Sequence, residues 1–174
     1  RIKQYEIAFK MQASVPELLD LSSEPESTFK LYGDDAKLRG SYAANCLLAR
    51  RMAERGVRFI QLYHVGWDHH QNIPRDLPLM CGDVDLATAG LIKDLKSRGM
   101  LDSTLVNCTS EFGRQPAAQG KKAKGRDHNA GVFTAWLAGG GIKGGTSYGQ
   151  SDDLGFKVGE HPAYSYDFHA TALH

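Results

Sequence analysis

Two apolar segments rich in β-branched and aromatic residues lie on either side of a segment with helical periodicity. The first is VRFIQLYHV, residues 57–65, and the second is STLVNCTS, residues 103–110. Between them, residues 83–99 repeat apolar side chains at helical spacing. A strand, a helix and a strand in this order form a right-handed crossover, which makes the two strands parallel neighbours. The sequence therefore predicts an α/β fold with a largely parallel sheet flanked by helices.

A further helix is predicted before the first strand, over residues 34–56, with Asp34 as a candidate N-cap and Gly56 as a candidate C′ glycine. Residues 1–34 are weakly patterned, and we expect an N-terminal arm or the remnant of a preceding segment there. Residues 35–174 are then the C-terminal part of one domain. Because no helix start signal precedes the opening residues, we expect this chain to be a piece of a longer one.

Charge and hydropathy exclude several functions. The net charge of +1 gives no overall field for nucleic acid, and no run approaches the roughly 20 apolar residues that span a bilayer. Three cysteines fit neither a disulfide framework nor a zinc ribbon. The basic cluster KKAKGR, residues 121–126, is interpreted as a loop that could attract an anion.

The segment GWDHHQN, residues 66–72, follows the first predicted strand and contains three candidate metal ligands. In an extended segment, side chains two residues apart point the same way, so Asp68 and His70 could reach one metal while His69 points elsewhere. A carboxylate with an imidazole suits zinc or another first-row divalent ion. The alternative is a polar turn in which Asp68 bonds its own backbone.

Two further segments carry candidate site residues. Glu111 and Arg114 follow the strand at 103–110, where Glu111 could bind a metal and Arg114 an anionic oxygen, or the two could form a surface ion pair. His128, in GRDHN, could complete a set of two histidines and one carboxylate. It precedes a third predicted strand over 132–141 and reaches the site only if that strand is antiparallel or the preceding loop folds over the sheet edge.

Several blocks in fixed order resemble the sulfatase-related bacterial family called domain of unknown function 1501, which is common in planctomycetes. The resemblance covers roughly residues 38–174 and rests on CLLARRMAERGVRFIQLYHVGWDHHQN, LIKDLKSRGMLDSTLV, TSEFGRQP, GRDHN, AWLAGGGIKGGTSYGQSDDLG and YDFHATALH. It implies a partial alkaline phosphatase-like fold of the phosphatase–sulfatase superfamily. By the same resemblance Asp68, His70 and His128 are metal ligands and Glu111 is the next carboxylate. The expected cofactor is a divalent metal, with zinc preferred and calcium as the alternative.

The sequence also departs from the superfamily pattern. Glu111 replaces an aspartate, Phe112 stands where a histidine or asparagine ligand is usual, and the nucleophile is expected on an N-terminal strand outside this chain. The implied activity is hydrolysis of sulfate or phosphate esters, with Arg114 holding the anion of a small ester or of a sulfated or phosphorylated glycan. One alternative is an exported pseudoenzyme or glycan-binding protein of the same fold. Another is that the metal has only a structural role.

The resemblance implies export to the periplasm or the extracellular space, because family members typically carry a twin-arginine leader. A sheet without its N-terminal strand would expose an edge, and we therefore expect that this chain can self-associate.

Overall fold

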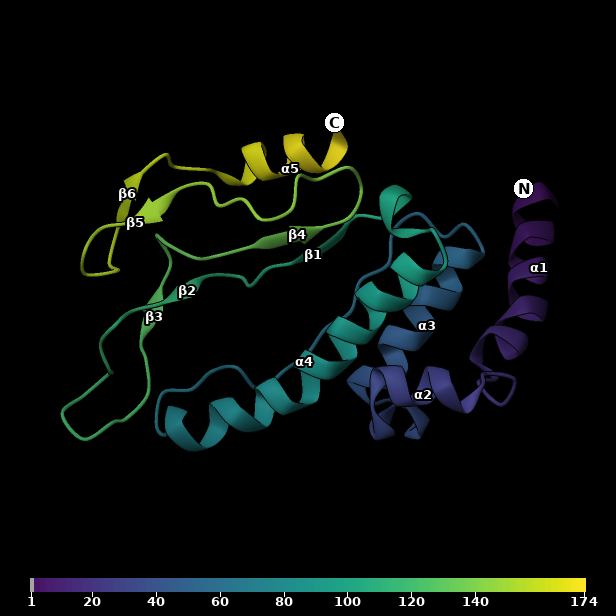
Figure 1. Ribbon diagram of the computed structural model, residues 1–174, viewed down its shortest axis with the longest axis horizontal. Helices are drawn as coiled ribbons and strands as arrows, with labels where there is room; N and C mark the ends of the chain where they lie inside the picture. Colours follow the sequence, from purple (N-terminus) through teal and green to yellow (C-terminus); the bar gives the residue numbers. More distant parts are fainter. Residues whose placement is uncertain (1) are drawn as a thin grey trace. The chain divides into compact units, whose positions relative to one another are not determined.

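The computed structural model describes residues 2–174 and is mostly helical, with three small antiparallel sheets of two strands each (Figure 1). The α-helices are α1 (Ile2–Leu19), α2 (Glu26–Tyr32), α3 (Tyr42–Glu54), α4 (Ile73–Ser97) and α5 (Ser165–Leu173). Two short 3-10 helices are η1 (Asp34–Lys37) and η2 (Leu101–Ser103). The strands are β1 (Val106–Cys108), β2 (Gly113–Arg114), β3 (His128–Asn129), β4 (Trp136–Ala138), β5 (Gln150–Ser151) and β6 (Val158–Glu160).

The chain divides into two compact units. The first contains the residues up to Val65 together with Gly82–Arg98, and the second contains Gly66–Cys81 together with Gly99–His174. The first unit is helical and holds the buried apolar side chains. The second holds all three sheets, in the pairs β1–β4, β2–β3 and β5–β6.

The core of the first unit lies between α2, α3 and the C-terminal part of α4. Its four largest fully buried side chains are Tyr32, Cys46, Leu47 and Leu95. The helix α4 comes close to the end of α2 because Gly90 has no side chain: a methyl group there would lie 2.6 Å from the carbonyl oxygen of Leu31.

The predicted α/β fold with a parallel sheet is wrong: in the described residues 2–174 every strand pairs antiparallel, and there is no alkaline phosphatase-like parallel sheet. Residues 57–65 belong to no strand and no helix. Exposure does alternate from residue 59 to residue 65: the odd-numbered positions are exposed and the even-numbered positions are half-buried. A strand, however, also needs a neighbouring backbone for its hydrogen bonds, and no described segment supplies one here.

The other predicted strands are shorter than expected. Only Val106–Cys108 of the segment 103–110 and Trp136–Ala138 of the segment 132–141 form strands, and they pair with each other. Val106 lies opposite Ala138, and Cys108 lies opposite Trp136.

The helices follow the sequence more closely. The helix predicted over 34–56 is divided into η1 and α3, and Ser41, not Asp34, caps α3 by accepting a hydrogen bond from the Ala44 amide. Gly56 has the positive φ of 77° that a C′ glycine adopts. The helix α4 begins ten residues before the predicted start, and α1 lies within the weakly patterned residues 1–34. Among the described residues, no helix combines the length and apolar character needed to cross a membrane.

Candidate metal centre

The backbone of the GWDHHQN segment lies against the loop that leads to His128. The Lys124 amide donates to the Gln71 carbonyl at 2.9 Å, and the Arg126 amide donates to the His69 carbonyl at 2.9 Å. Gly125 makes this approach possible, because a Cβ at that position would collide with the backbone of His69 and His70. Two segments more than fifty residues apart are thereby held side by side.

The β2–β3 pair then brings Arg114 and His128 together. The two strands are antiparallel, and Arg114 lies directly opposite His128 in their register. Side chains directly opposite each other in a sheet lie on the same face. Both side chains extend to the same atom, Asp68 Oδ1.

Side-chain nitrogens of three residues lie close to one atom, Asp68 Oδ1. It lies 2.7 Å from Arg114 Nη1, 2.9 Å from His128 Nε2 and 3.0 Å from His70 Nε2. The two imidazole Nε2 atoms are themselves 3.0 Å apart. Asp68, His70 and His128, which we call the Asp-His-His triad, thus present three ligand atoms at the corners of a nearly equilateral triangle.

The triad fits a first-row divalent metal. With zinc–ligand bonds of about 2.0–2.1 Å, two ligand atoms of a tetrahedral site lie about 3.3 Å apart, so small outward shifts would admit the ion. Two imidazole nitrogens and one carboxylate also suit zinc better than calcium, which prefers oxygen ligands. Three protein ligands leave one coordination position open, as in catalytic zinc sites.

One feature of the triad departs from a typical metal site. A metal-bound imidazole usually donates its other N–H to an acceptor that fixes the ring. His70 Nδ1 is buried and has no hydrogen-bond partner among the described residues. The His70 ring is therefore oriented by packing and by its contacts at Nε2.

The electrostatics of the site favour a permanently ionised Asp68. The hydrogen bond from His128, followed by that from Arg114, lowers the pKa of Asp68 to about 2. The carboxylate is 64% exposed, so solvent screens these contacts, and their main consequence is that Asp68 is ready to bind a cation at ordinary pH.

Phe112 supports the arrangement from the β2 side. Its ring lies 4.3 Å from that of His128, centroid to centroid, and the Arg114 guanidinium lies 5.5 Å from its centroid. Phe112 thus packs against one histidine of the triad and against the neighbouring arginine.

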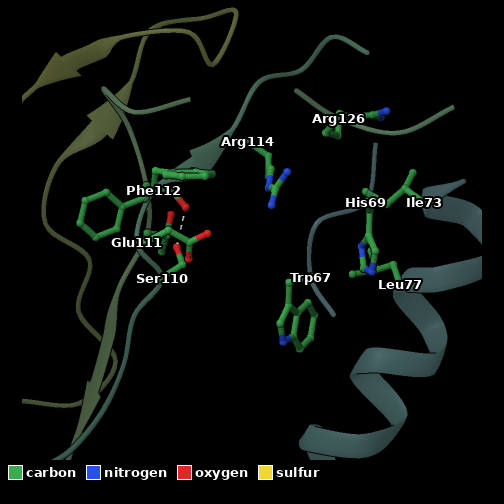
Figure 2. Close-up of a pocket in the computed structure, with 12 residues that line it drawn as sticks. Trp67, His69, Ile73, Leu77, Ser110, Glu111, Phe112, Arg114 and Arg126 are labelled. Carbon is green, nitrogen blue, oxygen red and sulfur yellow. Dashed lines mark hydrogen bonds between the residues drawn. The ribbon is translucent and has the colours of Figure 1, made fainter. Parts of the chain in front are cut away.

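The structure places the other residues of interest as follows. Glu111 is exposed, lies outside the triad and lines a neighbouring cavity with Arg114 (Figure 2). Arg114 pairs with Asp68, not with Glu111 as the ion-pair alternative proposed. His69 is buried beside the triad and is not a member of it.

Two residues that support the site escaped sequence reasoning. Nothing in the local sequence indicates that Gly125 lies against the backbone of His69 and His70. Asn129, next to His128, is buried, and its side-chain amide donates to the carbonyls of Gly155 and Phe156 while its oxygen accepts from the Gly131 amide. An asparagine is a common turn residue, and its spatial neighbours cannot be read from the local sequence.

Comparison with known proteins gives a family but no characterised relative. No curated protein and no solved structure matches the chain. The model of a family described as "Protein of unknown function (DUF1501)" matches residues 1–174, so the chain belongs to the DUF1501 family.

Proposed function

We propose that this chain carries the metal centre of a hydrolase that acts on sulfate or phosphate esters. The observation that supports the proposal is the convergence of both triad histidines and Arg114 on one oxygen of Asp68. Such a site combines metal ligands with a cation that can hold an anionic group.

The residues of the site have separable roles in this proposal. Asp68, His70 and His128 hold the divalent ion, for which zinc is the best fit. Such an ion acts as a Lewis acid that polarises an ester oxygen. Arg114 lies within hydrogen-bond distance of the triad and offers its remaining N–H groups to the non-reacting oxygens of a sulfate or phosphate group. Phe112 keeps His128 and Arg114 in place.

The decisive experiment measures metal content. Metal and anion binding test this chain directly, because the structure describes the residues that would carry them. Elemental mass spectrometry of protein dialysed against zinc should find about one zinc per chain, and Asp68→Ala should lose it. His169→Ala is the matched control: it removes an exposed histidine of α5 that is not part of the triad, and it should keep the zinc. Equal zinc content in Asp68→Ala and wild type would contradict the proposal.

A second candidate function is binding of a sulfated or phosphorylated glycan without hydrolysis. Phe112 favours it, because its apolar ring, which lies tilted against that of His128, stands where the superfamily pattern has a ligand for a second metal. The two functions differ in turnover: the protein should release nitrophenol from 4-nitrophenyl sulfate or phosphate only if it is a hydrolase.

A further inference from the structure

A cavity of about 250 Å³ lies beside the triad within the second unit. The apolar walls of the cavity come from Trp67, Ile73, Leu77 and Phe133. Arg114 also lines the cavity, and its guanidinium donates a hydrogen bond to Asp68. Figure 2 shows the Arg114 side chain extending between the Ser110–Phe112 segment and His69. The cavity therefore has an apolar body and connects to the triad through Arg114. Polar and charged side chains also line it, namely Ser110, Glu111, Arg126 and Thr134.

His69 provides the second observation. The residue is only 7% exposed, it lines this cavity, and its Nε2 atom is buried without a hydrogen-bond partner among the described residues. A buried polar atom that lacks a partner is costly and rare in folded proteins. A small turn of the His69 ring toward the cavity would let a ligand there supply the missing partner.

The size and walls of the cavity define the ligand. An apolar cavity of about 150 Å³ accommodates benzene, so the volume here suits one substituted ring. It is too small to enclose an oligosaccharide. Aromatic and aliphatic walls favour a flat apolar group, which gains by leaving water.

We propose that this cavity binds the alcohol part of the ester, that this part is an aromatic ring with a hydrogen-bonding substituent, and that His69 selects for the substituent. This inference rests on the proposed function, because the anionic group of the ester is placed at Arg114 and the triad. His69 acts here as a specificity determinant. The Nε2 atom bonds the ring substituent, and no proton transfer is involved.

Isothermal titration calorimetry on the zinc-loaded chain tests the inference with four probes: methyl phosphate, phenyl phosphate, and the 3- and 4-hydroxyphenyl phosphates. Burial of the ring should make phenyl phosphate bind at least about tenfold more tightly than methyl phosphate. At least one hydroxyl substituent should add a further gain of about three- to tenfold. In His69→Phe the hydroxyl gain should disappear, while the preference for phenyl over methyl phosphate remains.

The outcomes separate the cavity from the anion site. Equal binding of methyl and phenyl phosphate, or a hydroxyl gain that persists in His69→Phe, would overturn the cavity assignment and leave the metal centre intact. If no phosphate binds at all, the proposed function fails and the inference fails with it. If circular dichroism shows that His69→Phe does not fold, Leu77→Trp serves instead: it fills the cavity and should weaken phenyl phosphate but not methyl phosphate.

Discussion

His128 Nε2 lies 2.9 Å from Asp68 Oδ1, although the two residues are 60 positions apart in the sequence. The contact exists because β2 and β3 pair antiparallel with Arg114 opposite His128, and because the loop before β3 is hydrogen-bonded to the GWDHHQN segment. The triad and Arg114 are thus held by backbone contacts, which can be perturbed separately from the ligands themselves.

Arg114→Met should weaken anion binding without removing the metal. The substitution keeps much of the aliphatic length but deletes the guanidinium that lies next to the triad. Loss of a charge-assisted contact should lower the affinity for inorganic phosphate by about tenfold or more, as measured by equilibrium dialysis of the zinc-loaded chain. The zinc content should stay at about one per chain. Arg58→Met, at an exposed arginine of the other unit, is the control, and an equal loss of affinity in both variants would contradict the assignment.

Asp68→Asn should weaken zinc binding at every pH between about 5 and 8. The contacts with His128 and Arg114 lower the pKa of Asp68 to about 2, so the wild-type carboxylate is charged throughout this range. The substitution removes that charge and nearly keeps the size of the side chain. Competition with a fluorescent zinc chelator should therefore show a lower affinity in the variant at each pH measured. Equal affinities would contradict a ligand role for the Asp68 carboxylate.

Gly125→Ala should disturb the metal centre although it removes no ligand. The added methyl group would collide with the backbone of His69 and His70 and separate the two segments that carry the triad. Zinc affinity, measured in the same chelator competition, should fall by at least about tenfold, which corresponds to about 1.4 kcal/mol of binding free energy. Gly144→Ala is the matched control, because a Cβ at Gly144 meets no atom within 4 Å. Unchanged affinity in Gly125→Ala would show that the loop is not needed to hold the triad.

The sequence predicted local features of the molecule well and pairings poorly. Helical spacing located α3 and most of α4, because such patterns depend on residues within a few turns. Residues 57–65, predicted as a strand, form none, because sheet formation depends on a second segment that the local pattern does not specify. The parallel arrangement was inferred from chain order alone, and the antiparallel register of β1 and β4 overturns it.

For the site, the spacing of Asp68 and His70 is enough to suggest that both side chains bind one metal, because they lie in one short segment. The approach of His128 could be stated only as a condition, namely an antiparallel strand or a loop that folds over. The structure meets it, because β4, which lies within the predicted strand over 132–141, is antiparallel to β1. His128 itself lies in β3, opposite Arg114 of β2. The pairing of Arg114 with Asp68, and the space left by Gly125, depend on this tertiary arrangement and have no local signal.

Arg50→Met should strongly destabilise the helical unit. The Arg50 side chain is 3% exposed and forms ion pairs with Glu24 at 2.7 Å and Asp94 at 3.0 Å, and both carboxylates are buried. Removal of one member of a buried ion-pair network leaves uncompensated charge and costs about 3–5 kcal/mol. Urea unfolding followed by far-UV circular dichroism should measure this loss. Lys37→Ala, which breaks an exposed pair with Glu26, is the control and should cost no more than about 1 kcal/mol.

Glu24 should make the same unit sensitive to acid. Burial opposes ionisation of its carboxyl group, but the guanidinium groups of Arg50 and Arg51 outweigh burial and hold the pKa of Glu24 below its usual 4.5. A carboxyl group with a lowered pKa in the folded state contributes stability that is fully present above about pH 4.5 and is lost as the pH falls through the folded pKa. Urea midpoints measured between about pH 6 and pH 3 should therefore fall more steeply in wild type than in Glu24→Gln, which has no proton to gain. Glu160→Gln, at an exposed carboxylate of β6, should follow the wild-type curve, and parallel curves for wild type and Glu24→Gln would show that the Glu24 carboxylate does not set the acid limit.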